Sequence, residues 1–117
     1  MTVTHLNPGP RMSEAVRIGD IVFLAGQIPQ DMSAGIEAQT EQVLAGIDRV
    51  MAALGGTRAD VASVQVWLSD MADFPGMNAV WDKWVDPKTP PARATCGVAL
   101  ARPGMRVEMI AVAKLPG

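Results

Sequence analysis

One segment of the chain combines a rigid loop with an arginine at the start of an expected strand. It runs Pro90-Pro-Ala-Arg93-Ala-Thr95-Cys96-Gly97. Arginine stays charged at physiological pH, and its planar guanidinium can give a carboxylate two parallel hydrogen bonds. An arginine that follows a proline loop, rather than lying on a mobile helix surface, is suited to bind a small acid. The alternative is a structural arginine that pairs with an acidic neighbour.

Two more residues in the C-terminal half could take part in catalysis. Glu108 lies in the middle of an expected strand among apolar residues. A buried carboxylate has a raised pKa and can act as a general base, but it can equally be one half of a structural ion pair. Cys96 is the only cysteine, and no histidine is placed to activate it, because the single histidine, His5, lies near the N-terminus. The alternative for Cys96 is a small buried residue.

A further group of candidates lies on the expected helix that precedes this segment. Asn78 carries an amide that could hydrogen-bond a ligand or cap a loop. Trp81 and Trp84 follow it at helical spacing, and each could line a pocket or belong to the core. The residue types alone leave both alternatives open.

Several common catalytic arrangements are missing from the sequence. With one histidine and one cysteine, the chain has no Ser-His-Asp triad and no histidine or cysteine cluster for a metal. Gly26-Gln27 follows an expected strand but opens no helix, so it does not form a dinucleotide-binding turn. The sequence therefore predicts no metal and no cofactor.

Composition limits the classes of partner. The 117 residues include 10 basic and 12 acidic ones, and the basic residues are scattered from Arg11 to Lys114. Nucleic-acid binding usually needs a basic patch, so we expect no nucleic-acid partner. The longest apolar runs, such as 21–25, are far shorter than the roughly 20 residues of a membrane span. We expect a cytoplasmic protein with no membrane partner.

Two helices are expected to position the candidate residues. Between residues 33 and 54, apolar residues recur every three or four positions, and Gly55-Gly56 supplies the stop. For the second helix, Asp70 and Asp73 are candidate N-caps and Pro75 suits the first turn. Its apolar stripe then runs to a proline-rich loop.

Strands are expected at residues 13–18, 21–24, 61–69, 92–100 and 106–113, after an extended arm at 1–11. The strand at 13–18 is predicted to lie at a sheet edge. The clearest pattern is in 61–69, where Val64 and Val66 alternate with Trp67. The order β-β-α-β-α-β-β predicts one α/β domain, an α+β two-layer sandwich in which a mixed sheet lies under two helices.

With both helices on one face, the other face of the sheet is expected to be bare. It still carries Trp67, and the last strand is apolar on both sides except at Glu108. A large apolar patch is unfavourable in water. We therefore expect a closed homo-oligomer that buries the bare faces against each other.

Several short motifs appear in order along the chain and at fitting intervals. They are Ser13-Glu-Ala-Val16, Leu24-Ala-Gly-Gln27, Asn78 with Trp81 and Trp84, Pro91-Ala-Arg93, and Val107-Glu108. Together they resemble the RidA family, also called YjgF or RutC, over residues 11–115. The Trp-Asp-Lys-Trp-Val segment is most similar to the YoaB-type subgroup.

The resemblance implies a quaternary structure as well as a fold. The implied fold is like that of bacillus-type chorismate mutase. The implied assembly is a homotrimer in which three sheets face inward as a barrel. One ligand pocket is then expected in each cleft between subunits.

The resemblance also implies an activity, the hydrolysis of reactive 2-imino or enamino acids to 2-keto acids and ammonia. The implied partners are small 2-imino or 2-keto carboxylic acids. Arg93 matches the family arginine that clamps the substrate carboxylate. Backbone groups near Thr95 and Gly26 would add hydrogen bonds, and Asn78 and Trp84 match positions around the pocket. The implied chemistry is to hold the carboxylate, polarise the imine and add one water.

Two positions depart from the family pattern. Met12 stands at a substrate-binding position where RidA proper has a pocket tyrosine. Ile110 stands where RidA proper has a second glutamate, two residues after the one that Glu108 matches. Water activation then falls to Glu108, to Glu14 or to backbone groups. The alternative function is a non-catalytic module of the same family that binds small carboxylates or 2-keto acids.

Overall fold

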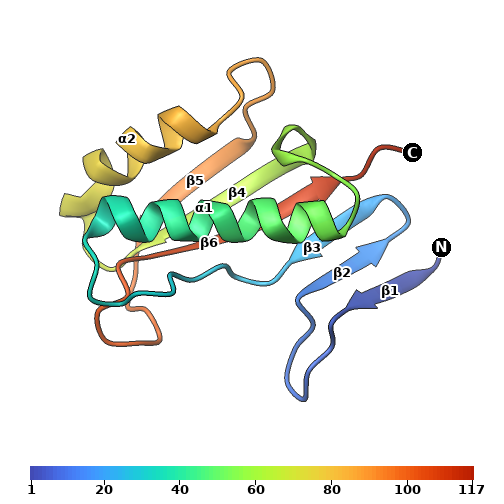
Figure 1. The fold of residues 1–117 in the computed structure, drawn as a ribbon, viewed down its shortest axis with the longest axis horizontal. Helices are drawn as coiled ribbons and strands as arrows, with labels where there is room; N and C mark the ends of the chain where they lie inside the picture. The colour runs from blue at the N-terminus through green and yellow to red at the C-terminus, as the bar shows by residue number, and fades with distance from the viewer.

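The computed structural model describes residues 1–117 as one six-stranded sheet with two α-helices on one face (Figure 1). The strands are β1 (Val3–Leu6), β2 (Ala15–Ile18), β3 (Ile21–Leu24), β4 (Val61–Leu68), β5 (Ala92–Gly97) and β6 (Val107–Lys114). The helices are α1 (Ile36–Ala53) and α2 (Phe74–Trp84), and two short 3-10 helices, η1 (Arg58–Asp60) and η2 (Met71–Asp73), precede β4 and α2. The order across the sheet is β1-β2-β3-β6-β4-β5, and only β4 and β5 are parallel. The predicted two-layer α+β fold with a mixed sheet is confirmed.

The N-terminal arm forms a strand that the sequence pattern did not predict. β1 pairs antiparallel with β2, with Val3 opposite Ile18 and Leu6 opposite Ala15. The observed order is therefore β-β-β-α-β-α-β-β, and the predicted order was one strand short. β2 is an inner strand and not the predicted edge strand, because β1 satisfies the N–H and C=O groups on its outer side.

Helix α1 begins at Ile36 and not at residue 33, since Gly35 is its N-cap. No side chain caps this end. The predicted stop is confirmed, because Gly55 adopts a φ of 82°, a left-handed conformation that glycine tolerates without strain.

Helix α2 has a proline in its first turn and Asp73 at its N-cap position, as expected. Asp70 caps η2, because its carboxylate accepts a hydrogen bond of 2.9 Å from the Ala72 N–H. Asp73 occupies the N-cap position of α2 but makes no capping hydrogen bond. Its carboxylate lies 3.4 Å from Arg106 Nη1 instead. Asp73 is therefore the N-cap by position, as the sequence predicts, but its carboxylate makes this ion pair and no capping hydrogen bond.

Strand β5 ends at Gly97, earlier than the predicted 92–100. It lies at the edge of the sheet, and its only neighbour is β4. The last residue of β4, Leu68, is opposite Gly97. Beyond this point β5 has no strand partner, and the chain turns back toward β6.

The core lies between the helices and the face of the sheet that they cover. It is a cluster of 21 buried residues, drawn mainly from α1, α2 and the four inner strands. Val64, Val66 and Leu68 of β4 belong to it, as predicted. Burying a side chain of this size contributes roughly 1.5–3 kcal/mol relative to leaving it exposed. The edge strands β1 and β5 supply none of the cluster, so β5 side chains are available for other contacts.

The opposite face of the sheet has no cover within the chain, as the sequence predicts. Ile21 and Phe23 of β3 are 39% and 46% exposed. Phe23 pairs with Val112 of β6, and the pairing of β6 with β4 puts Trp67 on the same face. We call this surface the bare face. Neither helix is long and apolar enough to cross a membrane.

Candidate functional site

Arg93 lies on edge strand β5, on the side of the sheet that the helices cover. Its register partner on β4 is the buried Val64, and residues in register on neighbouring strands share a face. The guanidinium carbon is 5.0 Å from the centre of the Trp81 ring and 5.8 Å from that of Phe74. Nη1 is 3.9 Å from the sulfur of Met77. Three side chains of one α2 stripe therefore support the Arg93 side chain.

The charge of Arg93 has no acidic partner in the chain. The ion pairs of the structure join Arg17 to Asp20, Arg58 to Asp48 and Arg106 to Asp73. The ion pair that a purely structural Arg93 requires is thus not formed. A guanidinium that stacks on an aromatic ring keeps its N–H groups at the rim of the stack, where they can still donate. Arg93 is consequently free to bind an external carboxylate.

A shallow hollow of about 250 Å³ lies beside Arg93 between β4 and β5. Gln65 and Ala94 are among the residues that line it, together with Arg93 itself. Because β5 is the last strand of the sheet, nothing in the chain closes this hollow on its outer side. One chain therefore provides only part of an enclosure at this edge of the sheet.

Glu108 lies on the bare face, opposite Trp67 in the register of β6 and β4. Its carboxylate packs against the main chain of Gly26, where a Cβ would collide with Oε2. Only glycine permits this approach. Burial raises the pKa of the Glu108 carboxyl above its usual value, because the charged form loses solvation. The group is therefore suited to proton transfer.

Arg93 and Glu108 do not meet within one chain. Their register partners Val64 and Trp67 point to opposite faces of β4, which lies between β5 and β6. Arg93 is thus on the helix-covered face and Glu108 on the bare face. A site that uses both groups needs a second copy of the chain.

The other residues that the family resemblance selected lie in three places. Thr95 is half-buried on β5, two residues beyond Arg93 and on the same face. The Gly26 N–H has no main-chain acceptor, so it can donate to a ligand. Asn78 is half-buried on α2, next to the fully buried Met77. Met12 is 68% exposed in the loop before β2.

Trp84 is integrated into the core and does not contact Arg93. It is 9% exposed, and its indole N–H donates a 3.0 Å hydrogen bond to Asp48 Oδ2. Arg58 stacks on the Trp84 ring at 5.1 Å and donates to the main-chain oxygen of Trp84 at 2.7 Å. The Trp81 and Trp84 ring centres are 5.4 Å apart. Trp84 therefore supports Trp81, which in turn supports Arg93.

Cys96 is exposed on the bare face, opposite Trp67. Within one chain Cys96 is thus not the small buried residue of the alternative, because β5 is an edge strand and nothing in the chain covers this face. Nδ1 of His5, the only histidine, is 3.0 Å from Ser13 Oγ. No group of three or more histidine, cysteine, aspartate or glutamate side chains is close enough to hold a metal ion.

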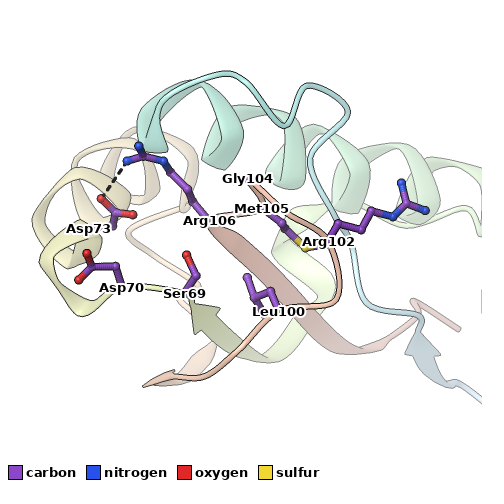
Figure 2. Close-up of a pocket in the computed structure, with 8 residues that line it drawn as sticks. All are labelled: Ser69, Asp70, Asp73, Leu100, Arg102, Gly104, Met105 and Arg106. Atoms are coloured by element: carbon purple, nitrogen blue, oxygen red, sulfur yellow. Dashed lines mark hydrogen bonds and ion pairs between the residues drawn. The ribbon is translucent and has the colours of Figure 1, made fainter.

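The sequence did not predict a hollow of about 380 Å³ at the end of β4 (Figure 2). Ser69, Asp70, Asp73 and Arg106 line it, with residues of the turn before β6. The only signal in the sequence was the presence of opposite charges at distant positions, such as Asp73 and Arg106. Only the folded chain shows which of these charges form pairs. Because Asp73 neutralises Arg106, this hollow offers little free positive charge.

Comparison with known proteins identifies the family. The family model described as Endoribonuclease L-PSP matches residues 3–115. A RutC family protein of Haemophilus influenzae is 35% identical, and the match covers 97% of this chain and 98% of the relative. The chain belongs to the YjgF/RutC family.

A solved YjgF-family structure extends the likeness to three dimensions. The Neisseria meningitidis protein is 39% identical and superposes with a TM-score of 0.96, over all of this chain and 98% of the other. The RutC family protein YoaB of Escherichia coli is 31% identical, over 97% of this chain and 98% of YoaB. The resemblance to the YjgF/RutC family in the sequence is thus confirmed, and so is the fold that it implied.

Proposed function

We propose that this YjgF/RutC protein hydrolyses reactive 2-imino and enamino acids to 2-keto acids and ammonia. The observation that carries the proposal is Arg93, an arginine without an acidic partner that stacks on Trp81 beside an open hollow. Such a group matches the carboxylate that all these substrates share. A second candidate group, Glu108, has the raised pKa expected of an acid or base in catalysis.

The proposal includes a homotrimer. Arg93 and Glu108 lie on opposite faces of the sheet, and the bare face is apolar and exposed at Ile21 and Phe23. Closed oligomers remove such a face from water. In the proposed trimer, the β5 edge of one subunit lies next to the Glu108 side of its neighbour, so each cleft between subunits holds one complete site.

For this hydrolysis the protein needs only to orient the substrate and to transfer protons. Water adds to the carbon of the C=N group, the tetrahedral intermediate loses ammonia, and a C=O group takes the place of the imine. Arg93 orients the substrate by its carboxylate, and the Gly26 N–H and main-chain groups near Thr95 add hydrogen bonds. Glu108 accepts a proton from the attacking water and passes it to the imine nitrogen, which gives the amino group of the intermediate. It then carries the hydroxyl proton of the intermediate to the same nitrogen, so that ammonia leaves as the C=O group forms. Orientation alone can contribute several kcal/mol to such a reaction.

A second candidate function is a module that binds 2-keto acids without turnover. Ile110 favours it, because this side chain follows Glu108 on the same bare face and offers no group for proton transfer. Arg93 serves both functions equally, since both need a carboxylate clamp. The two candidates therefore differ only in turnover.

Imine hydrolysis in a coupled assay tests the proposal. An amino-acid oxidase generates the imine in place, and semicarbazide competes for it. We expect less semicarbazone with the wild type and with Lys83→Ala, a variant that loses an exposed cation from α2. Arg93→Ala is expected to have no effect on the semicarbazone yield.

Calorimetry with a 2-keto acid such as pyruvate distinguishes the two functions. Binding that is lost in Arg93→Ala, without any turnover by the wild type, supports the binding module. Equal affinity of the wild type and Arg93→Ala contradicts the assignment of Arg93 in both.

A further inference from the structure

A second hollow, of about 360 Å³, lies between helix α1 and the segment that follows β3. Two arginines line it, Arg49 from α1 and Arg102 from the turn before β6. The other polar side chains around it are the amides Gln27, Gln30 and Gln42, and no carboxylate takes part. The volume falls within the range of sites for small molecules. We call it the two-arginine pocket.

Neither arginine of this pocket is neutralised within the chain. The three ion pairs of the structure involve other arginines. Three acidic residues adjoin the pocket lining in sequence, Asp31, Glu41 and Asp48. Asp31 Oδ1 already accepts from the Ser33 hydroxyl at 2.6 Å and the Ser33 N–H at 2.9 Å. Asp48 pairs with Arg58 at 2.7 Å, and Glu41 forms no ion pair. Two positive charges therefore face one hollow without a counter-charge.

The direction of Arg102 supports this assignment. Arg102 borders both hollows, but Figure 2 shows its guanidinium pointing away from Asp70, Asp73 and Arg106. Its side chain therefore does not join the acidic residues of the other hollow.

The walls of the two-arginine pocket are held in place by two amides of α1, Gln39 and Gln42. Gln39 is fully buried; its Nε2 donates to the main-chain oxygens of Ala34 and Gly104 at 2.9 and 2.8 Å, and its Oε1 accepts from the Arg106 N–H at 2.8 Å. It thereby ties the loop before α1 to the turn that carries Arg102. A pocket whose walls are fixed in advance loses less entropy on binding.

Gln42 completes the wall one turn further along α1. Its Oε1 accepts from the N–H groups of Gln30 and Asp31 at 2.8 and 2.9 Å, so the amide N–H2 is the part left for a ligand. Gly46 follows at the next turn, where a Cβ would lie 2.6 Å from Gln27 Oε1. The glycine thus makes room for the buried Gln27 at the base of the pocket.

The two-arginine pocket adjoins the proposed deaminase site, because Gly26 lines the pocket and also offers its N–H to the proposed substrate. Gln27 bridges to Met109 and lies on the helix-covered face, whereas Glu108 touches the neighbouring Gly26 from the bare face. Arg93 is at the far edge of the sheet, beyond β6 and β4. Within one chain, a ligand in this pocket would therefore not reach Arg93.

We infer that the two-arginine pocket binds a small molecule through an oxyanion group, a phosphate or a carboxylate. Both groups accept several hydrogen bonds at once and fit the planar fork of arginine. The free donors of the pocket, two guanidinium groups and the Gln42 amide, match that requirement. The site does not depend on the proposed deaminase activity.

Calorimetric titrations of the protein with inorganic phosphate and with succinate test the inference. They also show whether the pocket binds a phosphate group or a carboxylate group. We expect saturable binding of at least one of them. Each of Arg49→Gln and Arg102→Gln should weaken it about tenfold, since each removes charged hydrogen bonds. Arg11→Gln, which removes an exposed arginine elsewhere, should leave it unchanged. In Arg93→Ala, which removes the proposed carboxylate clamp, binding should persist and still depend on Arg49 and Arg102.

A second measurement locates the ligand directly. In an NMR titration, the side-chain amide signals of Gln42 and Gln30 should shift on addition of the anion. The dissociation constant fitted to these shifts should equal the one from calorimetry. The inference is overturned if neither anion binds saturably, if the double variant of Arg49 and Arg102 binds as the wild type does, or if Arg93→Ala abolishes the binding. Because Arg49 and Arg102 are exposed, the variants are expected to fold, and circular dichroism checks this.

Discussion

The guanidinium of Arg93 lies 5.0 Å from the centre of the Trp81 ring, and no carboxylate of the chain pairs with it. The stack holds the arginine by its flat face and leaves its edge open. An acidic partner would hold it as firmly but would occupy the donors that a substrate needs. Trp81 is therefore a positioning residue for the proposed carboxylate clamp.

Replacement of Trp81 by leucine tests this relationship. We expect Trp81→Leu to weaken binding of a 2-keto acid by up to about 30-fold, because a partly buried cation–π contact contributes roughly 0.5–2 kcal/mol. The loss of a ring that is 6% exposed should also destabilise the fold by about 2–4 kcal/mol. Calorimetry and urea unfolding measure the two effects.

The conservative variant Trp81→Phe is the control for this prediction, since it keeps an aromatic face under Arg93. It should restore most of the affinity and leave kcat nearly unchanged while KM rises slightly. Equal affinity of Trp81→Leu and the wild type would show that the ring does not position the arginine.

The pH dependence of activity tests Glu108. A raised pKa means that the carboxyl holds its proton at pH values where an ordinary glutamate, with a pKa near 4.5, has lost it. A protonated carboxyl cannot accept a proton from water, so kcat/KM should fall on the acid side, beginning above the usual range. Glu108→Gln should remove this limb and reduce the rate at neutral pH by about 100-fold or more.

Glu14→Gln is the matched control for Glu108. The Glu14 carboxylate accepts a 2.8 Å hydrogen bond from Asn7 and belongs to a different part of the surface. The acid limb should persist in this variant. If the acid limb of kcat/KM is lost in Glu14→Gln but persists in Glu108→Gln, Glu14 and not Glu108 is the general base.

A charge on the bare face tests the proposed trimer. Phe23 is 46% exposed at the centre of that face, and we expect Phe23→Asp to dissociate the assembly into chains of 12.4 kDa. Activity should be lost in parallel, because each proposed site needs two subunits. Light scattering after size exclusion measures the mass, and Ala45→Asp on the exposed side of α1 is the control. A wild type that is already monomeric contradicts the proposal.

The contacts of Asp48 predict a purely structural effect. Its carboxylate accepts from Arg58 Nη2 at 2.7 Å and from the Trp84 indole at 3.0 Å. Asp48→Ala leaves both donors without a partner and should cost about 1–3 kcal/mol of unfolding free energy. Asp82→Ala, on the exposed side of α2, should change it by less than about 0.5 kcal/mol. Asp48→Ala and Asp82→Ala should bind a 2-keto acid with similar affinity once folded. A loss of affinity in Asp48→Ala alone would instead show that Trp84 belongs to the proposed substrate site.

Gln39 predicts a larger loss of stability. The residue is fully buried and hydrogen-bonds main-chain groups of two separate loops. Gln39→Ala should cost about 3 kcal/mol or more, since several buried groups lose their partners at once. Urea unfolding measures this, with the exposed Glu41→Ala on the same helix as the control. A cost below about 1 kcal/mol would mean that water replaces the amide.

The elements that carry the candidate site were readable from the sequence because each has a strong local pattern. The alternation of Val64, Val66 and Trp67 predicted β4 and its two faces, and the apolar stripe of α1 predicted its long helical run. Motif order along the chain then identified the family. Such signals need only neighbours in the sequence, because side-chain periodicity follows directly from backbone geometry.

The sequence did not predict features that depend on pairing between distant segments. β1 carries a weak pattern of four residues, and it forms because β2 presents an unpaired edge to it. Asp73 takes the predicted N-cap position of α2, but its carboxylate pairs with Arg106, 33 residues further along the chain, and makes no capping hydrogen bond. In both cases a long-range partner overrides the local preference.

For this protein, the sequence by itself determined the family, the two helices and five of the strands, and the family resemblance made Arg93 the candidate carboxylate clamp. Only the tertiary structure decided that Arg93 rests on Trp81 without an acidic partner, that Trp84 is bonded into the core, and that Glu108 lies on the opposite face of the sheet. The physical reason is that burial and charge pairing depend on which segments the fold brings together, whereas strand and helix periodicity do not.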